Sequence, residues 1–401
     1  MTVLFLSMSR IETISNRGIY ADLLRYVRDQ GHSIFLVSPR ERSLRLPTGF
    51  DEKDGIHILG VRTLNLQKTS IIEKGVGQLL VEYQYRAAIR KYLKKVPFDL
   101  ILYSTPPITF TAAIRYVKRQ NPSARTYLLL KDIFPQNAID IGMLHKSGIG
   151  GILYRFFRRK EKELYFLSDN IGCMSPANVD YVIKQNSEIP SSKVEIAPNS
   201  IQPVEASTND KTAIRQKYGL PVDRPIFIYG GNLGKPQGIP FLMECLTVNS
   251  NRTDCHFIVV GNGTELPKIK KWYSENTPAC VTLLDRLPKD DYDLLVSSCD
   301  VGLIFLDHRF TIPNYPSRLL PFLEHKMPII AATDPNSDVG KIAEENGYGY
   351  WCESNSVEAF TDAINKMICA DRQTMGRRGY EFLCKNYLVE NTYDAIMKHF
   401  D

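Results

Sequence analysis

Short apolar runs alternate with amphipathic stretches along the first half of the chain. The runs VLFLSM (3–8), HSIFLVSP (32–39) and FDLILYST (98–105) are typical of buried strands, whereas residues 18–31 place apolar side chains on one helical face. The pattern predicts further helices near 73–95, 108–120, 149–167 and 176–185, and further strands over 125–134, 169–175 and 193–199. Strands separated by helices of ten or more residues indicate parallel βαβ units and hence a doubly wound sheet.

The segment IQPVEASTND (201–210) shows neither the two-residue period of a strand nor the 3.6-residue period of a helix, and its composition is typical of a linker. After it the alternation restarts, with strands over 225–231, 255–263, 279–287, 300–307, 327–333 and 347–353 and helices over 238–249, 266–276, 290–299, 317–326, 356–368 and 371–400. We therefore expect an α/β chain of two doubly wound, Rossmann-like domains facing a cleft. The expected domains are residues 1–203 and 204–385, with a C-terminal helix over 386–401. Such sheets bind ligands beyond the carboxyl ends of their strands.

Composition narrows the class of protein. The 401 residues, 43% apolar and 23% charged, suffice for two cores and contain no run long enough to span a membrane. The first residues predict a buried strand rather than a signal peptide. The eight cysteines form no C-x-x-C pair, which favours reduced thiols in a cytoplasmic protein.

Charge differs between the two halves. Residues 1–203 hold 29 Lys and Arg against 18 Asp and Glu, a net +11, whereas residues 204–401 hold 21 against 26, a net −5. A polyanion facing the first half is one explanation, either nucleic acid or the anionic inner face of a membrane, and a scattered, solvated excess is the other. The segment 149–167 interleaves basic and aromatic residues and fits either a membrane surface or a solvated helix face: Arg155, Phe156, Phe157, Arg158, Arg159, Lys160, Lys162 and Tyr165.

Glycines and cations follow successive strands of the second half. Gly230, Gly231, Gly234 and Gly238 lie between a strand and a helix, where close backbone approach and a helix N-terminus favour anions. Glycine-rich turns also occur for packing alone, and neither a Walker A loop nor a dinucleotide fingerprint is present. The next strand ends carry Gly261, Gly263, Arg286, Lys289, His308, Arg309 and Arg318. We expect a nucleoside-diphosphate site, with Lys235 adding a positive charge.

In the first half, LLLKDIFPQNAIDIGML places Lys131 and Asp132 where a strand ends. Asp132 is positioned to orient an acceptor hydroxyl, although a helix cap or a structural ion pair explains it equally well. Asn16, Arg17 and Gly18 follow the first strand at the same edge. The acidic run DDYD (290–293) suits the first turn of a helix better than a metal site, so no metal is expected.

The order of GGNLGKPQG, VVGNG, DRLPKDD and NYPSRLLPFLEHKMPIIAATDPNSDVG resembles the family 4 retaining glycosyltransferases of the GT-B fold. Together with KDIFPQNAIDIGML, it is most similar to the bacterial branch that includes L-fucosamine transferases of polysaccharide assembly. The resemblance implies that the C-terminal domain binds a nucleoside-diphosphate sugar, UDP-linked, and that the N-terminal domain binds the acceptor. It also implies a last helix that returns to the first domain.

Transferred residue by residue, the resemblance places Gly230, Gly231, Gly234 and Lys235 against the donor diphosphate, with Asn232 and Gln237 where the family has Arg and Lys. It places Gly261 and Gly263 near the nucleoside, Arg286 and Leu287 near the base, and Asn314, Tyr315, Ser317 and Arg318 near the phosphates. Pro313 and Pro321 occupy the positions of the family's two glutamates, so Glu324 is the candidate ribose ligand.

The implied reaction stabilises the leaving diphosphate by backbone N–H groups and cations, Arg318, Lys235 and Arg286, with no cofactor or metal. Expected partners are a nucleotide sugar, a polyprenyl-diphosphate-linked acceptor and an anionic membrane, with no nucleic acid, and the expected place is the cytoplasmic face of the membrane. Two alternatives share the fold: a sugar-nucleotide epimerase and an inactive protein that binds a sugar nucleotide.

Overall fold

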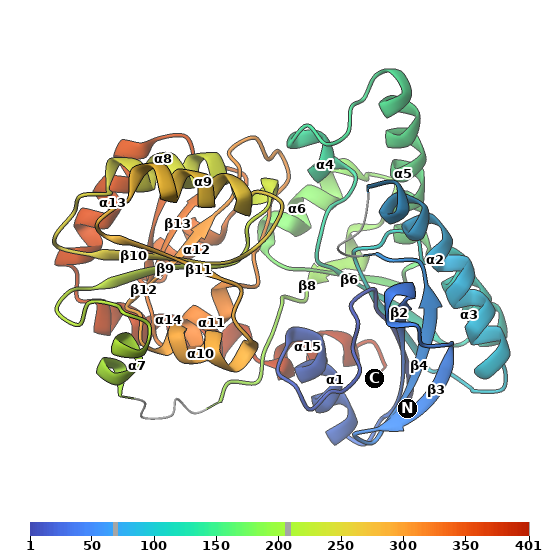
Figure 1. Ribbon diagram of the computed structural model, residues 1–401. Coiled ribbons are helices and arrows are strands. Elements are labelled where there is room, and N and C mark those ends of the chain that lie inside the picture. Colours follow the sequence, from blue (N-terminus) through green and yellow to red (C-terminus); the bar gives the residue numbers. More distant parts are fainter. Residues whose placement is uncertain (67–70, 205–209, 401) are drawn as a thin grey trace. The chain divides into compact units, whose positions relative to one another are not determined.

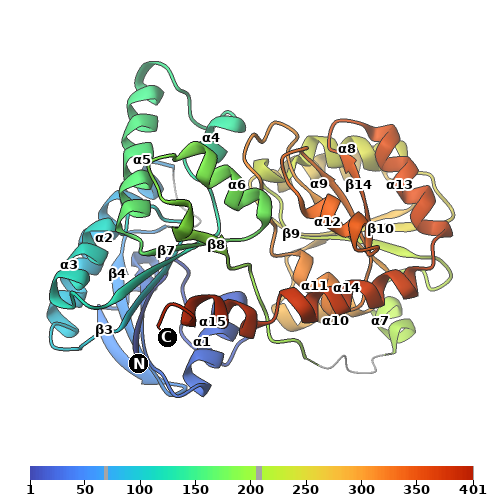
Figure 2. The same ribbon diagram turned by 180° about the vertical axis from the view of Figure 1, so that it is seen from behind.

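The computed structural model describes residues 1–66, 71–204 and 210–400. The chain forms two compact units (Figures 1 and 2): unit 1 is Met1–Gln202 with Val389–Asp401, and unit 2 is Pro203–Leu388. The predicted linker lies at this division, and its residues 205–209 fall outside the described residues.

Over the described residues, unit 1 is built on an eight-stranded sheet in the order β3-β4-β2-β1-β5-β6-β7-β8, parallel except for the β3–β4 pair. The strands are β1 (Thr2–Leu6), β2 (Ser33–Glu41), β3 (Gly49–Lys53), β4 (Ile56–Thr63), β5 (Leu100–Ser104), β6 (Arg125–Leu130), β7 (Asn170–Cys173) and β8 (Val194–Ile196). The helices are α1 (Ile19–Asp29), α2 (Ile71–Tyr92), α3 (Thr111–Gln120), α4 (Gln136–Asp140), α5 (Gly148–Leu167), α6 (Pro176–Gln185) and α15 (Val389–Met397).

The core of unit 1 shows why these runs form strands. β1 and β5 are buried on both faces, as the continuous apolar runs predict. Leu24 and Val27 of α1 and Ile396 of α15 share one core with Phe5 of β1. α15, from the far end of the chain, therefore lies beside α1, as both ribbon views show (Figures 1 and 2).

Unit 2 contains a six-stranded, fully parallel sheet over its described residues, in the order β11-β10-β9-β12-β13-β14. The strands are β9 (Ile226–Asn232), β10 (His256–Asn262), β11 (Val281–Asp285), β12 (Val301–Phe305), β13 (Ile329–Thr333) and β14 (Gly349–Glu353). The helices are α7 (Lys211–Lys217), α8 (Ile239–Val248), α9 (Leu266–Asn276), α10 (Lys289–Ser297), α11 (Leu319–Glu324), α12 (Val339–Glu345), α13 (Val357–Cys369) and α14 (Arg372–Asn386).

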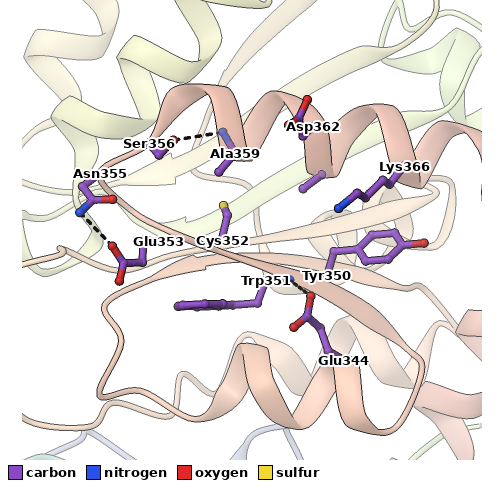
Figure 3. A pocket seen from close by; sticks show the side chains of 11 residues that line it. Glu344, Tyr350, Trp351, Cys352, Glu353, Asn355, Ser356, Ala359, Asp362 and Lys366 are labelled. Carbon is purple, nitrogen blue, oxygen red and sulfur yellow. Dashed lines mark hydrogen bonds between the residues drawn. The ribbon is translucent and has the colours of Figure 1, made fainter.

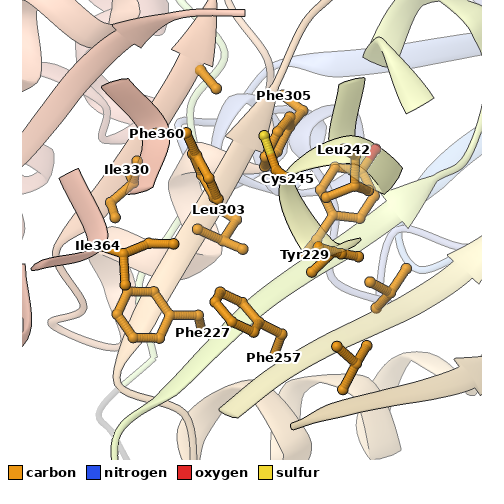
Figure 4. Packing of buried hydrophobic residues seen from close by; sticks show 14 of the residues in the cluster. Phe227, Tyr229, Leu242, Cys245, Phe257, Leu303, Phe305, Ile330, Phe360 and Ile364 are labelled. Carbon is orange, nitrogen blue, oxygen red and sulfur yellow. The ribbon is translucent and has the colours of Figure 1, made fainter. Parts of the chain in front are cut away.

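Aromatic side chains fill the core on the α8 and α13 face of this sheet. Figure 4 shows Phe227, Phe257 and Phe305 of three adjacent strands in one cluster with Leu242 of α8 and Phe360 of α13. α10 and α11 cover the opposite face (Figure 1). Both units are thus doubly wound, and the predicted fold class of two Rossmann-like domains is confirmed.

Several local features differ from the expectation, among them β4, α7 and α12, which were not predicted. The hairpin β3–β4 was not predicted, because β3 is a polar and exposed edge strand; its signal is the Asp54–Gly55 turn, where both residues have positive φ. The expected single helix over 371–400 is two helices, α14 and α15, separated at Tyr387 and Leu388. Among the described residues, no helix is long and apolar enough to cross a lipid bilayer.

Candidate functional site

The turns after β9 and β10 touch each other backbone to backbone. Gly231 pairs with Gly261 in the parallel register. A Cβ atom on Gly261 would lie 1.9 Å from the carbonyl oxygen of Gly231, and one on Gly263 would lie 2.2 Å from that of Leu233. Leu233 N donates to Asn262 O at 2.9 Å across the same contact. The packing of the two turns therefore requires glycine at 261 and 263, whatever else these residues bind.

The loop after β9 is closed by two amide side chains. Asn232 Nδ2 donates to Gln237 Oε1 at 2.9 Å, and the backbone N of Gly234 donates to the same oxygen at 3.2 Å. The two residues that stand where the resembling family has cations thus hold each other. The side chain of Lys235, between them, is exposed and forms no hydrogen bond or ion pair with the described residues.

Gly230 and Gly231 have different environments. A Cβ atom on Gly230 would lie 2.1 Å from the phenol oxygen of Tyr292 in α10, so Tyr292 covers this residue. Gly231 has φ +118, which favours glycine, and a Cβ atom there would lie 3.8 Å from the guanidinium of Arg318. Gly231 therefore leaves room beside a cation.

Arg318 precedes α11, and its positive charge has no carboxylate partner among the described residues. Its guanidinium lies 4.6 Å from the ring centroid of Tyr229, a cation–π contact. Its Nη1 is buried and has no hydrogen-bond partner among the described residues. Burial raises the pKa of Tyr229 and of Tyr292, and the charge of Arg318 opposes both shifts. A buried donor without an acceptor is costly unless a ligand completes it, so Arg318 points to an anion.

The other cations at this edge differ in their partners. Arg286 follows β11, is exposed and has no ion pair within the described part of the chain. Asp285 before it pairs in register with Gly261, so the ends of β9, β10 and β11 are level. Arg309 instead makes a two-pronged ion pair with Asp307, at 2.7 and 2.8 Å, and Lys289 pairs with Asp293. Of the predicted cations, Arg318, Lys235 and Arg286 remain available.

A buried loop after β13 supports the segment that leads to Arg318. Asp334 is fully buried and its oxygens accept from Asn336 N, Ser337 N and Ser337 Oγ at 2.8–2.9 Å. Ser337 Oγ accepts from Asn314 N at 2.9 Å. Burial raises the pKa of Asp334 to about 6, although these hydrogen bonds act to lower it. The backbone N–H of Asn314 is thus engaged within the protein, whereas Ser317 is exposed.

Tyr315 and Glu324 point into unit 2. The phenol of Tyr315 is buried and hydrogen-bonded to that of Tyr387. Glu324 is 6% exposed, and its Oε1 accepts from Val204 N at 2.9 Å. Leu287 lies half-buried after β11. The role of Glu324 as a ribose ligand stays a prediction, and its carboxylate already has a partner in unit 2.

The predicted acceptor-side residues lie in unit 1. Lys131 and Asp132 follow β6, and Thr105 Oγ1, after β5, accepts from both of their backbone N–H groups at 3.0–3.1 Å. Lys131 Nζ donates to Ala197 O at 3.1 Å, and Asp132 Oδ1 accepts from Asn137 Nδ2 at 2.7 Å. These contacts join four segments at the carboxyl edge of the sheet.

Burial shifts the pKa values of both Lys131 and Asp132 in the direction that favours the uncharged side chain. Burial lowers the pKa of Lys131 to about 7. Burial raises the pKa of Asp132 to about 6, against hydrogen bonds from Asn137 and the Ile133 backbone. Lys131 and Ile19 of α1 line a cavity of about 10 Å³, room for one water-sized group. Gly18 precedes that helix, Arg17 is half-buried, and Asn16 is exposed.

A larger cavity, of about 390 Å³, lies at the far edge of the unit 2 sheet, along β14 (Figure 3). Several of its polar groups are engaged with the protein: Glu344 accepts from Trp351 N, Asn355 donates to Glu353, and Ser356 caps α13. It contains none of the predicted site residues. The acids of DDYD do not converge either, since Asp291 pairs with Lys217 and Asp293 with Lys289. No group of His, Cys, Asp or Glu in the described ranges is arranged to hold a metal.

Sequence reasoning missed Tyr229, Tyr292, Asp334 and Ser337, which shape the site around Arg318 and Asn314. Tyr229 directly precedes the glycine pair, and the Asp-Pro-Asn-Ser run over 334–337 is typical of a side-chain-capped turn, so both carried a signal. Tyr292 carried none, because only the tertiary structure brings α10 over Gly230.

Two doubly wound units are the architecture of the GT-B fold, which solved structures of this chain's fold share. Sucrose-phosphate synthase from Thermosynechococcus elongatus has the same fold, with a TM-score of 0.77, 15% identity, and coverage of 100% of this chain and 98% of that chain. HepE from Anabaena, solved in complex with UDP, matches with a TM-score of 0.69 and 13% identity over 100% of this chain and 99% of that chain.

Residues 210–382 match the family described as Glycosyl transferases group 1. The chain is 23% identical over 324 residues to a Pseudomonas aeruginosa protein named as a glycosyltransferase, WbjE, covering 80% of this chain and 78% of that one. It is 21% identical over 289 residues to Escherichia coli K12 WcaI, named for colanic acid biosynthesis, covering 70% and 69%. Unit 2 is a group 1 glycosyltransferase domain, and the chain is a glycosyltransferase, as the resemblance implied.

Proposed function

We propose that this enzyme moves a sugar from a nucleoside-diphosphate sugar to a lipid-linked glycan acceptor during assembly of a bacterial surface polysaccharide. The proposal that the enzyme binds a nucleoside-diphosphate donor is supported above all by the guanidinium of Arg318, which lies beside Gly231 and has a buried nitrogen without a hydrogen-bond partner among the described residues. The name of WcaI, which refers to colanic acid biosynthesis, supports the polysaccharide half.

The donor diphosphate is proposed to lie against the β9 turn. Arg318, Lys235 and Arg286 supply positive charge there, and the backbone of Gly231 leaves room for a phosphate oxygen. Fixed donors act most strongly on charge that develops as the bond to the leaving group breaks. We propose UDP as the nucleotide, supported by the UDP complex of HepE, and no metal or cofactor.

The proposed chemistry is retaining, as in family 4. The acceptor hydroxyl attacks on the face of the sugar that the diphosphate leaves, and the departing phosphate oxygen takes the hydroxyl proton. No carboxylate nucleophile is then needed. Asp132, half-buried and held by Asn137, is proposed to orient the acceptor hydroxyl, with Lys131, Asn16, Arg17 and Gly18 beside the acceptor. A polyprenyl-diphosphate-linked acceptor implies contact with the cytoplasmic face of a membrane.

A panel of nucleotide sugars, incubated with the enzyme and a membrane lipid extract, tests this proposal. Transfer of label into lipid, dependent on one donor and insensitive to chelation by EDTA, is the expected result. Epimerised sugar without an acceptor would indicate the epimerase, which the family match does not favour. Donor binding with no turnover on any lipid extract would indicate an inactive binding protein, the alternative that Pro313 and Pro321 raise.

A further inference from the structure

The first half of α5 has an apolar face that nothing in unit 1 covers. Ile149, Ile152, Leu153 and Phe156 follow the i, i+3, i+4, i+7 spacing of one helical face, and their exposed fractions run from 40% for Phe156 to 81% for Ile149. We call these four residues the α5 stripe. Met143, just before the helix, is 62% exposed. The first turns of α5 project beyond the other helices of unit 1 in both ribbon views (Figures 1 and 2).

The remainder of α5, above all its second half, packs against unit 1. Gly151, Glu161, Leu164 and Tyr165 are buried, and Tyr165 OH donates to Glu161 at 2.9 Å. The α5 stripe therefore belongs to a helix that is anchored in unit 1 and still exposes four apolar side chains. A contiguous exposed apolar face of this kind marks an interaction surface.

The charged side chains of the segment that carries the stripe are all basic. Residues 141–160 contain no Asp or Glu. Arg155 and Arg159 are exposed and have no ion pair within the described ranges, and Lys146 lies 5.3 Å from the ring centroid of Tyr154. Free cations therefore border an apolar stripe.

Like charge argues against a second copy of this chain as the occupant. A twofold pairing of two α5 stripes would bring the same unneutralised arginines together, which is unfavourable without counter-charges. A lipid surface with anionic headgroups buries the apolar side chains and neutralises the arginines at once. We propose that the α5 stripe inserts into the headgroup region of an anionic bilayer, with Arg155 and Arg159 on its phosphates.

This surface differs from the one expected from sequence. Arg158 was expected to face the membrane, but it pairs with Glu161 and donates to Gln185 O and to Asn186 Oδ1 at 2.9 and 2.6 Å. Lys160 pairs with Glu82 at 2.9 Å and Lys162 with Glu188 at 2.6 Å. Insertion of apolar side chains therefore supplies much of the binding free energy, and salt does not weaken this contribution.

The proposal gives a surface to the membrane contact of the proposed function, and its test needs no transfer activity. The full chain is sedimented with vesicles of phosphatidylcholine, pure or with 30% phosphatidylglycerol, at low and high salt. The variants are Ile149→Ser/Ile152→Ser and Arg155→Glu/Arg159→Glu. The matched control, Val222→Ser/Val248→Ser, changes two exposed apolar residues of unit 2. Hydrogen exchange of the wild-type chain with vesicles locates the contact without any substitution.

We expect the Ile149→Ser/Ile152→Ser variant to bind anionic vesicles at least about tenfold more weakly at both salt concentrations. Each substitution removes most of the free energy gained by burying an isoleucine side chain in the bilayer. The glutamate pair should remove the preference for anionic vesicles, the control should bind like wild type, and exchange should slow over residues 143–156. Equal binding of wild type and the serine pair would overturn the proposal. So would self-association that the serine pair abolishes, measured by sedimentation velocity, without vesicle binding.

Discussion

The strand-end regions of the two units occupy the same position in the same kind of sheet, but different chemical groups form them. In unit 2 the edge consists of backbone turns packed against each other, with an unneutralised Arg318 beside Gly231. In unit 1 it consists of two titratable side chains, Lys131 and Asp132, both shifted toward neutrality by burial. A fixed positive charge suits a permanently charged diphosphate, whereas groups with pKa values near neutrality suit an acceptor hydroxyl. The fold alone therefore does not determine which substrate each edge binds.

The largest expected effect is at Arg318. Arg318→Ala should lower turnover by about 10²–10³, the scale observed when one preorganised donor is removed. Arg309→Ala is the matched control, because Arg309 is already neutralised by Asp307 and should lose less than threefold. Steady-state turnover with a saturating donor checks both. A loss below threefold at Arg318 in a folded protein would remove it from the site.

The second test concerns why unit 2 uses glycine. Gly261→Ala should destabilise unit 2 by about 3 kcal/mol, because its Cβ would collide with the Gly231 backbone. Gly219→Ala, which adds only a positive-φ strain, should cost about 1 kcal/mol. The two tryptophans, Trp272 and Trp351, both lie in unit 2, so tryptophan fluorescence during urea unfolding reports this unit. Equal losses would mean that the two turns can separate.

The third test concerns the half-buried carboxylate of Asp132 in unit 1. Its folded pKa of about 6 exceeds its unfolded value, so the contribution of Asp132 to stability is present at low pH and is lost as pH rises through about 6. Asp132→Asn should therefore raise the free energy of unfolding of unit 1 by about 1–2 kcal/mol at pH 7 and change it little at pH 4. Circular dichroism, compared with the tryptophan signal, checks this. The opposite pH dependence would contradict burial as the cause.

The smallest expected effect is at Ser337, which joins Asp334 to Asn314. Ser337→Ala should raise the KM for the donor about fivefold and cost about 1 kcal/mol of stability. Ser356→Ala removes a helix cap of similar worth in the same unit and should leave KM unchanged. If both variants change KM alike, the 334–337 loop has no special role in positioning the donor segment.

Much of this fold followed from the sequence, for a physical reason. Buried parallel strands are continuous apolar runs, so β1, β5, β9 and β12 were visible, whereas the polar edge strand β3 was not. Positions after parallel strands lie at one edge of a sheet, so Gly231, Arg286 and Arg318 were expected at the same edge, and Arg318 does lie beside Gly231. Which cation is neutralised depends on side-chain direction, so the pairing of Arg309 with Asp307 and of Arg158 with Glu161 could not be predicted.

Hydrogen exchange of the full chain with and without UDP distinguishes the two strand-end regions, because it reports both of them in one experiment. If the diphosphate binds beside Arg318, exchange slows at residues 230–238 and 314–320 of unit 2 and changes little at residues 131–137 of unit 1. Arg318→Ala should then abolish the protection. Protection confined to unit 1, or protection of unit 2 that survives Arg318→Ala unchanged, would contradict this placement of the diphosphate.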